Sequence, residues 1–378
     1  MNRKFVLVFS LLLIAAMVVS ACAAPVAAPA APAAEAPAAE APAAEAPAAE
    51  AAAGPFTIGL SNSFVSSEWR TQMIQNMQDL NAELMMTGLT NDLVIESADT
   101  DAQGQIQQIQ NLVNKGVNGI VLNPGDVTAL NTTLEEVVAG GVPVVSIDQA
   151  ICAEGVINVV IDQKEWAKIS MQWLADELGG KGDVVLIEGF PGHPANEARM
   201  AGVQEVLDQY PDIKVVGRDT GKWDQATGQQ VMSNFLASLP NIDGVWTQDG
   251  MATGALLAVQ TANPEKWPIM VGEQRASYLQ LWNEILQTRP DFTSIGVVNP
   301  PGVATSGMRV LLELLQGRTI DPAQLAGDCP TPNTLFVPIP GVVTSDNFAE
   351  AYEMVKDLPA SYTGDGMINA EEAAAFFQ

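Results

Sequence analysis

Short apolar runs alternate with longer segments of helical periodicity from residue 56 onward. Residues 56–61 predict a strand. Residues 68–86 predict a helix, because apolar side chains recur there every three or four positions. The short runs are apolar throughout, which is typical of strands covered on both faces of a sheet. This alternation predicts a parallel sheet with right-handed crossovers. It continues with strands at 93–97, 119–123 and 142–148 and helices at 105–115 and 127–139.

A second series of the same kind follows, and we expect the chain to cross between the two series near residues 160–163. The sequence therefore predicts an α/β protein with two doubly wound parallel-sheet lobes, each of a size that can hold its own core. The strands of the second series are expected at 183–188, 213–216, 244–247, 268–271 and 294–298, and its helices near 164–178, 196–209, 225–238, 251–262, 276–287 and 302–316.

Residues 1–21 have the layout of a secretory signal peptide. A short basic start, Asn2-Arg3-Lys4, precedes an apolar run at residues 5–19 that is short for a membrane-spanning helix. The run leads into Val19-Ser20-Ala21-Cys22, which resembles the lipobox of bacterial lipoproteins. The resemblance implies that Cys22 is diacylated and anchors the mature protein to a membrane. The alternative is an ordinary secreted protein that is cut near Ala21.

An alanine-, proline- and glutamate-rich spacer follows the cysteine. The pentad Ala-Pro-Ala-Ala-Glu recurs through residues 23–54. Prolines at five-residue spacing break helices, and this composition cannot form a core. We interpret residues 22–55 as a lipidated cysteine and an extended linker that lifts a domain off the membrane.

Composition excludes several classes of function. The chain has 44 acidic and 17 basic side chains and a net charge of −27, which argues against a nucleic-acid partner. One histidine, His193, and three cysteines exclude a histidine-rich metal site and a disulfide-dense scaffold. Neither a metal nor another cofactor is expected. The chain has no GxxxxGK[ST] stretch, so we do not expect it to hydrolyse ATP itself.

Polar residues gather where the predicted strands end, which is where open parallel sheets bind ligands. Sugar hydroxyls both donate and accept hydrogen bonds, which suits carboxylates, amides and arginines, and an indole can cover the apolar face of a ring. A single Asp or Asn after a strand is more often a turn or capping residue, so the recurrence in both series favours a site. The candidate ligand-binding residues are Ser61, Asn62, Glu68, Trp69, Arg70, Asp99, Asn123, Asp148, Gln149, Arg199, Trp223, Gln248, Asp249, Glu273, Gln274 and Asn299.

Over about residues 56–340 the chain resembles the periplasmic sugar-binding proteins of ABC transporters, in the ribose- and galactose-binding group. The resemblance implies a type I periplasmic-binding-protein fold, in which a hinge joins the two lobes. We expect an N-terminal lobe at 56–161 with a return segment at about 299–325. The C-terminal lobe is expected at 162–298 with a C-terminal segment at about 326–378. The stretches that carry the resemblance are 59–63, 67–70, 119–124, 142–148, 197–202 and 248–255.

The resemblance also implies roles for individual residues. Asp148 and Arg199 match an aspartate and an arginine that bind sugar hydroxyls, and Trp223 matches an aromatic residue that stacks on the ring. Asn123 matches an asparagine that lines the cleft. Trp69-Arg70 resembles a pair found in proteins that bind hexoses in furanose form.

The chain departs from the ribose-binding pattern at three strand ends. It has Asp148-Gln149 in place of Asp-Arg, Gln248-Asp249 in place of Asn-Asp, and Glu273-Gln274 in place of an aromatic residue and Asp. Replacing arginine by glutamine removes a fixed charge and a fork of donors. The ligand of this chain is therefore not expected to be ribose itself.

The function implied is that of an extracytoplasmic solute-binding lipoprotein on the outer face of the cell membrane. It captures a monosaccharide between two closing lobes and delivers it to an ABC permease whose ATPase is a separate chain. We expect a monomer without enzymatic activity. The alternatives are a sugar-sensing receptor subunit and a secreted glycoside-processing enzyme, for which Asp148 and Glu273 would supply paired carboxylates. A polyol or a nucleoside would fit the same side chains.

Cys152 and Cys329 remain once Cys22 is lipidated. Export would allow these two residues to form a disulfide that pins the C-terminal part of the chain near the first lobe. The alternative is two free thiols.

Residues 361–372 partly follow the pattern of an EF-hand loop. Asp365, Gly366 and Glu372 occupy suitable positions, but Ser361 and Thr363 stand where carboxylates belong. We interpret the stretch as a turn and a helix start rather than a calcium site.

Overall fold

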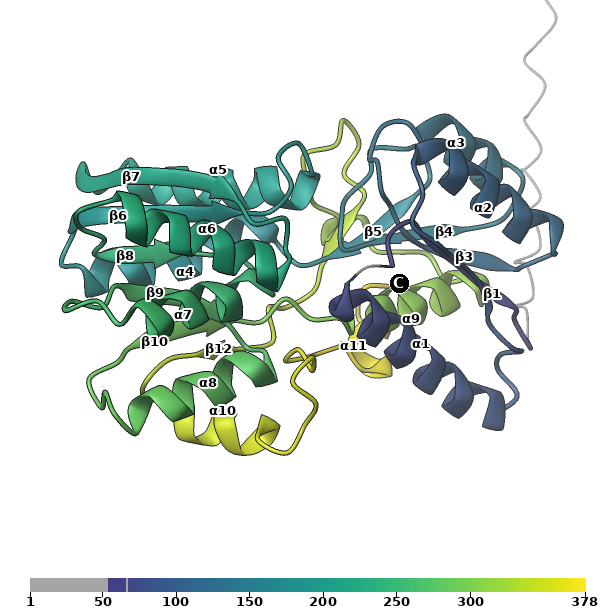
Figure 1. The fold of residues 1–378 in the computed structure, drawn as a ribbon. Helices are drawn as coiled ribbons and strands as arrows, with labels where there is room; N and C mark the ends of the chain where they lie inside the picture. Colours follow the sequence, from purple (N-terminus) through teal and green to yellow (C-terminus); the bar gives the residue numbers. More distant parts are fainter. Residues whose placement is uncertain (1–53, 66) are drawn as a thin grey trace, which may run out of the picture. The chain divides into compact units, whose positions relative to one another are not determined.

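Two six-stranded sheets form the framework of the protein. The computed structural model describes residues 54–65 and 67–378, so the predicted signal peptide, Cys22 and nearly all of the linker lie outside the described residues. Each sheet has helices on both faces (Figure 1). The predicted α/β architecture of two doubly wound lobes is confirmed.

The sheet of the N-terminal lobe has the strand order β11-β5-β4-β3-β1-β2, and all its pairs are parallel. Helices α1 and α9 cover one face, and α2 and α3 cover the other. The strands are β1 (Ile58–Asn62), β2 (Val94–Ser97), β3 (Gly119–Asn123), β4 (Val144–Ile147), β5 (Ile157–Val160) and β11 (Thr334–Phe336). The helices are α1 (Glu68–Met86), α2 (Ala102–Asn114), α3 (Asn131–Ala139), α9 (Val303–Leu315) and α11 (Ala370–Ala374), with a 3-10 turn η1 (Pro322–Gln324).

The sheet of the C-terminal lobe has the order β12-β10-β9-β8-β6-β7 and is parallel except for β12, which runs antiparallel to β10. Its strands are β6 (Lys181–Glu188), β7 (Asp212–Thr220), β8 (Gly244–Trp246), β9 (Ile269–Glu273), β10 (Ser294–Val297) and β12 (Val342–Val343). Its helices are α4 (Gln163–Glu177), α5 (Pro194–Leu207), α6 (Gln225–Ser238), α7 (Met251–Ala262), α8 (Ala276–Leu286) and α10 (Phe348–Val355).

The apolar runs of the strands are buried on both faces, as their composition predicts. Val121 and Val145 pack in the cluster that contains α1 and α9, whereas Ile120 and Leu122 pack with α2 and α3. Successive side chains of a strand point to opposite faces, so a strand between two helical layers needs apolar residues at every position. The sequence of β3, Gly-Ile-Val-Leu-Asn, meets this requirement until its final residue.

Three strands escaped prediction because they are short or contain polar residues. Strand β5 contains Asn158, which interrupts its apolar run, and β11 and β12 have three and two residues. Asn158 is nevertheless buried, because its side chain accepts a hydrogen bond from the Ile151 amide (2.9 Å) and donates one to Asn333 Oδ1 (2.8 Å). A buried amide that is fully paired is compatible with a core strand.

The C-terminal segment is divided between the two lobes, which corrects its assignment to the C-terminal lobe. Strand β11 pairs with β5 of the N-terminal sheet, β12 returns to β10, and α10 packs on α8. Helix α11 then packs on α9 in the N-terminal lobe. Sequence pattern alone could not show this, because two-residue and three-residue strands fit the edge of either sheet.

A strap at residues 359–366 joins the lobes where the C-terminal segment passes between them. On one side, the Ala276 amide donates to the Tyr362 carbonyl (2.8 Å), at the start of α8. On the other side, Gln72 of α1 donates to the Thr363 carbonyl (2.9 Å) and accepts from the Thr363 amide (2.9 Å). Asp365 accepts from the amide of Gly302 (2.6 Å) at the beginning of α9.

These contacts account for the stretch that partly follows the EF-hand pattern. The Asp365 carboxylate binds backbone and side-chain donors, including Asn76 of α1. Asn369 begins α11 with a capping box formed with Glu372. Within the described ranges there is no cluster of three or more metal-ligating side chains. None of the helices seen in residues 54–378 combines the length and apolar character that crossing a membrane requires.

Cys152 and Cys329 form a disulfide, with 5.2 Å between their Cα atoms. The bond ties the loop after β4 to the segment before β11. Asn333 braces the same loop, because its Nδ2 donates to the carbonyls of Ile151 (2.9 Å) and Val156 (3.0 Å). The loop that carries Asp148 is therefore fixed covalently and by a buried amide network.

We expect the double variant Cys152→Ser/Cys329→Ser to lose about 2–4 kcal/mol of unfolding free energy. The bond closes a loop of 177 residues, and removing it enlarges the conformational freedom of the unfolded chain. Urea titrations of the native protein with and without reductant should show the same loss. The double variant should not respond to reductant, and a native protein that is equally insensitive would contradict the prediction.

Candidate functional site

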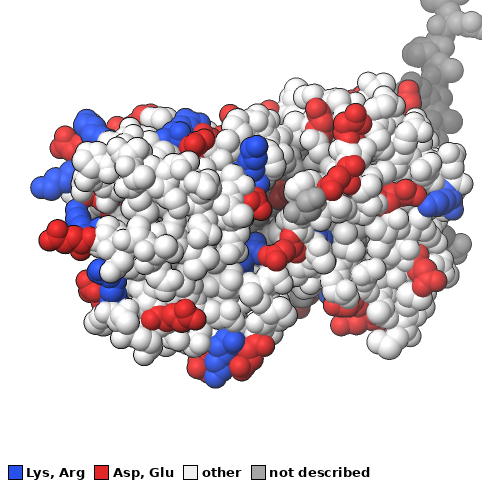
Figure 2. Space-filling view, in the orientation of Figure 1, with Lys and Arg blue, Asp and Glu red and all other residues white. Residues whose placement is uncertain are grey.

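A cavity of about 770 Å³ lies between the carboxyl ends of the two sheets. Its walls come from both lobes: α1 and the ends of β1 and β4 on one side, and the loops after β6, β7, β8 and β9 on the other. Opposite charges lie side by side along the line where the lobes meet (Figure 2). Of the predicted site residues, those that line the cavity are Glu68, Trp69, Arg70, Asp148, Arg199, Trp223, Asp249 and Asn299.

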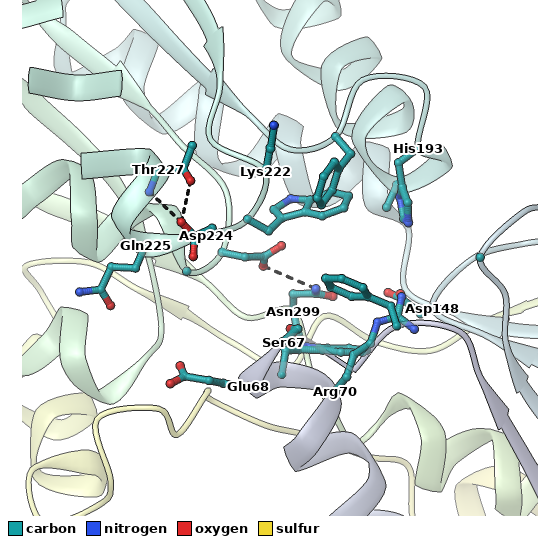
Figure 3. Close-up of a pocket in the computed structure, with 18 of the residues that line it drawn as sticks. Ser67, Glu68, Arg70, Asp148, His193, Lys222, Asp224, Gln225, Thr227 and Asn299 are labelled. Carbon is teal, nitrogen blue, oxygen red and sulfur yellow. Dashed lines mark hydrogen bonds and ion pairs between the residues drawn. The ribbon is translucent and has the colours of Figure 1, made fainter. Parts of the chain in front are cut away.

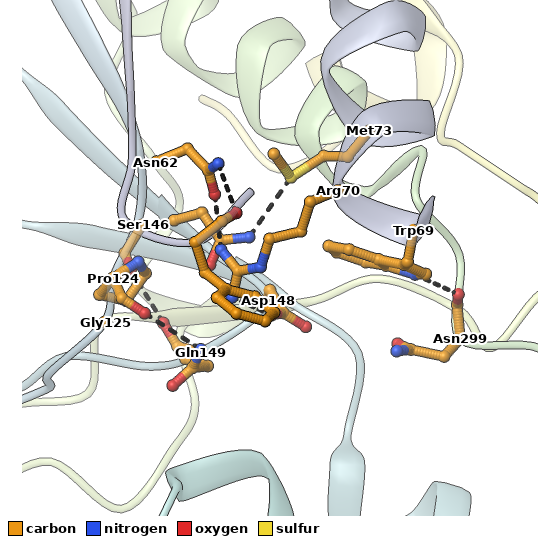
Figure 4. A network of polar contacts seen from close by, with 12 residues as sticks. Asn62, Trp69, Arg70, Met73, Pro124, Gly125, Ser146, Asp148, Gln149 and Asn299 are labelled. Carbon is orange, nitrogen blue, oxygen red and sulfur yellow. Dashed lines mark hydrogen bonds and ion pairs between the residues drawn. The ribbon is translucent and has the colours of Figure 1, made fainter. Parts of the chain in front are cut away.

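Arg70 and Asp148 face each other on the side of the cavity that the N-terminal lobe forms, with 3.9 Å between Arg70 Nη2 and Asp148 Oδ2. Asn62 accepts a hydrogen bond from Arg70 Nη1 (2.6 Å) and so fixes the guanidinium (Figure 4). Burial raises the pKa of Asp148, against the opposing effect of Arg70 and Arg199. Phe64 packs on the guanidinium of Arg70, 5.6 Å from ring centre to Cζ.

Arg199 occupies the corresponding position in the C-terminal lobe and is 1% exposed. Its Nε donates to Gln163 (2.8 Å), and its Nη1 donates to Asp249 (2.5 Å) and Gln248 (3.1 Å). The guanidinium also lies over the indole of Trp166, 4.2 Å from the ring centre. A buried arginine held at this many points has its direction set before any ligand arrives.

Aromatic side chains from both lobes form part of the cavity wall. The indole of Trp223 donates to Gln248 Oε1 (2.9 Å) and packs edge-to-face against Phe190 and His193, with ring centres 5.4 and 4.7 Å apart. Gly189 leaves the space that the indole fills, because a Cβ there would lie 2.2 Å from the ring. Phe190 in turn meets Phe64 of the other lobe at 6.4 Å.

Backbone strain is concentrated at this cavity. Among the described residues, five non-glycine residues have a positive φ, and four of them line it: Asp148 (67°), Lys222 (56°), Trp223 (54°) and Asp249 (46°). Such conformations cost of the order of 1–3 kcal/mol each and persist only where the surroundings enforce them. In this protein they turn side chains at strand ends into the cavity.

Arg275 lines the cavity and bridges the lobes, although the sequence did not mark it as a candidate. Its Nε donates to Glu273 (2.7 Å), and its Nη1 donates to Glu68 of α1 (2.9 Å) and to the Ser361 carbonyl in the strap (3.1 Å). Burial raises the pKa of Glu273 to about 7, although Arg275 acts in the opposite direction. The ion pair with Glu68 joins the two sides of the cleft.

His193 lines the cavity as a neutral side chain. Burial, reinforced by the charges of Arg70 and Arg199, lowers the pKa of His193 to about 4. No serine, cysteine or threonine side chain of the described residues forms a hydrogen bond with His193. The imidazole of His193 packs edge-to-face against the indole of Trp223.

Five predicted residues of the N-terminal lobe do not line the cavity, and each contacts a neighbouring residue instead. Asn62 holds Arg70, and Ser61 donates to Gln108 (2.9 Å). Asn123 contacts Met73 Sδ (3.3 Å), and Gln149 donates to the Pro124 carbonyl (3.1 Å). Asp99 accepts from the Val65 amide (2.7 Å). Four of these side chains are therefore buried beneath the site, whereas Asp99 is exposed.

Three predicted residues of the C-terminal lobe are likewise outside the lining. Gln248 accepts hydrogen bonds from both Arg199 and Trp223 and so connects them. Glu273 is 2% exposed behind Arg275. Gln274 lies under the strap, where its carbonyl accepts from the Gly364 amide (2.5 Å).

The cavity also contains residues that lay outside the predicted candidates. Most follow a strand by more than two positions, and Arg275 comes one residue after the predicted Glu273-Gln274 pair. Following each loop further beyond its strand would have found them. These residues are Ser63, Phe64, Ser67, Thr100, Gly125, Phe190, His193, Ala195, Lys222, Asp224, Gln225, Thr227, Gly250 and Arg275.

Known proteins resemble this chain in sequence and in fold. The family described as periplasmic binding protein domain matches residues 58–319. A xylitol-binding protein of Mycolicibacterium smegmatis is 35% identical over 182 residues, which are 47% of this chain and 52% of that protein. A ribose import binding protein of Bacillus subtilis is 30% identical over 213 residues, which are 56% of this chain and 67% of that protein.

The fold has solved counterparts. A solute-binding protein of an ABC transporter from Thermobispora bispora superposes with a TM-score of 0.73 at 23% identity, covering 85% of this chain and 94% of that one. The matched sequence spans about half the length of the xylitol-binding relative and two thirds of the ribose-binding one. The chain belongs to the periplasmic binding protein family.

Proposed function

We propose that this protein captures a monosaccharide or polyol in the cavity between its lobes, outside the cytoplasm, and delivers it to an ABC permease with a separate ATPase. The observation that carries this proposal is the pair of arginine–carboxylate units contributed by the two lobes. Arg70 and Asp148 come from one lobe, and Arg199 and Asp249 from the other. The sequence relatives that bind xylitol and ribose support it.

The chemistry of these units suits a polyhydroxylated ligand. A hydroxyl group both donates and accepts, so a carboxylate and a guanidinium side by side can engage neighbouring hydroxyls. The indole of Trp223 and the ring of Phe64 offer apolar faces for the C–H side of the ligand. Each cation in these units already has a carboxylate next to it, which favours an uncharged ligand.

The two-lobed site also explains how binding could drive closure. A ligand that contacts both lobes stabilises the closed arrangement to the extent that it binds the closed form more tightly than the open form. The Glu68–Arg275 ion pair and the strap contacts to Gln72 would then form part of the closed arrangement. Closure of this kind brings the surfaces of the two lobes together, and the protein presents this joined surface to the permease.

We expect a ligand titration of residues 54–378 to give a saturable change in tryptophan fluorescence with one sugar or polyol, at roughly micromolar concentration. Trp69 and Trp223 line the cavity, so their surroundings change when it fills. The panel should contain pentoses, hexoses, inositol, nucleosides and amino acids. A response to nucleosides or amino acids alone would contradict the proposed ligand class.

Arg199→Lys supplies a matched test in the same titration. It keeps the charge but removes the fork that reaches Gln163, Gln248 and Asp249, so affinity should fall about 10- to 100-fold. Arg218→Lys is the control, because Arg218 pairs with Glu188 outside the cavity lining and its side chain is half exposed. The control should bind like the native protein.

Glu273 predicts an effect of pH on stability. The unfolded carboxyl has its ordinary pKa, so between that value and about 7 the folded protein holds an extra proton. Stability therefore falls as pH rises through this window, by up to about 3 kcal/mol. The Glu273→Gln variant should lack this loss when urea unfolding is compared at about pH 5 and about pH 8.

His193 contributes with the opposite sign, because its lowered pKa makes stability rise as pH increases from about 4 toward its ordinary value. Comparing the variant with the native protein at both pH values cancels this contribution. Glu353→Gln, on the exposed face of α10, is the matched control. Equal pH dependence in the native protein and the Glu273→Gln variant would contradict the assignment.

We further infer that Cys22 carries a lipid that anchors the protein to the outer face of the cell membrane. The support is the stretch Val19-Ser20-Ala21-Cys22 after an apolar run, followed by a linker that suits a tether. Expressed in a bacterial host, the native protein should partition into detergent and incorporate a labelled fatty acid. Cys22→Ala should do neither, and incorporation that survives this change would contradict the anchor at Cys22.

A further inference from the structure

The cavity is larger than a single sugar ring requires. A hexose has twelve non-hydrogen atoms, so even at the roughly 30 Å³ that each water molecule occupies in the liquid it would fill less than about 360 Å³. The cavity of about 770 Å³, which is partly open to solvent, is more than twice that size. It has this size although the lobes already meet on both sides of it, through Phe64–Phe190 and through Glu68–Arg275.

Two of the arginines that line the cavity are held in the same way. Arg199 and Arg275 are both buried, and each is anchored through Nε and Nη1. Neither makes a hydrogen bond through Nη2 to any described residue, and both line the cavity. The Nη2 of Arg70 lies 3.9 Å from Asp148, beyond hydrogen-bonding distance. Each arginine thus keeps a terminal N–H group for the cavity, beside a carboxylate.

Arg275 and Glu68 form a third such unit, which lies next to Gly250 and within electrostatic range of Asp249. Figure 3 shows Glu68, Asp224, Gln225 and Thr227 toward one end of the pocket and Arg70, Asp148 and His193 toward the other, with Asn299 between them. Gly250 lies beside Arg275 at the first end, since a Cβ built on it would be 3.6 Å from Nη2, and both residues line the cavity. Gly250 is also the N-cap residue of α7 and supplies no side-chain cap.

We propose that the cavity takes a glycoside or disaccharide, with one polyhydroxylated unit between Arg70–Asp148 and Arg199–Asp249 and a second unit against Arg275 and Glu68. The inference rests on the proposed function and names the substrate class of the same site. The second unit accepts hydrogen bonds from Arg275 Nη2 and donates to Glu68. Asp224, Gln225 and Thr227 supply further polar groups on the same side.

The test is calorimetric titration of the full-length chain in mild detergent with matched pairs of ligands. Each pair joins a free monosaccharide or polyol to a disaccharide or methyl glycoside that contains it. We expect the two-unit ligand of one pair to bind at least about tenfold more tightly than its parent, the gain expected from hydrogen bonds to a charged side chain. Tight binding of a free monosaccharide with rejection of its glycosides would overturn the inference and leave the proposed function intact. No binding of any carbohydrate or polyol would overturn both.

Two variants of α1 distinguish the loss of a second subsite from a general loss of ligand affinity. Glu68→Gln should lower the ratio of glycoside affinity to monosaccharide affinity at least about fivefold, because it removes the charged acceptor beside Arg275. The exposed Glu83, on the same helix, makes no hydrogen bond or ion pair with a described residue, and Glu83→Gln should leave this ratio unchanged. An unchanged ratio in Glu68→Gln, with normal unfolding by urea, would show that the second unit does not bind there.

Discussion

Buried arginines between two lobes are the constraint on which the rest of this structure depends. A guanidinium removed from water is costly unless carboxylates and further acceptors surround it. Arg199 meets this demand through Gln163, Gln248 and Asp249, all within its own lobe. Arg275 meets it through Glu273 of its own lobe, the Ser361 carbonyl of the strap and Glu68 of the other lobe. The charge balance of the cleft is therefore tied to the relative position of the lobes.

The loops at the strand ends carry the strain of this arrangement. Asp148, Trp223 and Asp249 adopt left-handed backbone conformations that turn them toward the cavity. The disulfide and the buried Asn158–Asn333 network hold the loop that follows Asp148 in place. Rigid support of this kind lets a binding site be complete before its ligand arrives, which reduces the ordering that binding must accomplish.

Segments beyond the family match contribute to the site as well. The match ends at residue 319, yet the strap at 359–366 contacts α1, the beginning of α9 and Arg275. The C-terminal segment therefore passes from one lobe to the other and back, and it touches the helix that carries Trp69 and Arg70. Any opening of the cleft must rearrange or carry along these contacts.

The sequence by itself determined the two α/β lobes. Strands that are apolar throughout must be covered on both faces, and amphipathic helices must bury one face, so the helices pack on both sides of each sheet. It also located Asp148 and Trp223, since parallel strands bring their carboxyl ends to one edge, and Arg199, through the family resemblance. It could not show that Asn123 and Gln149 lie behind the wall, or that Arg275 lies in it. Whether a side chain at a strand end reaches the cavity depends on loop conformation and on contacts with the other lobe. Those contacts join residues more than 200 positions apart, such as Glu68 and Arg275, and only the tertiary structure decided them.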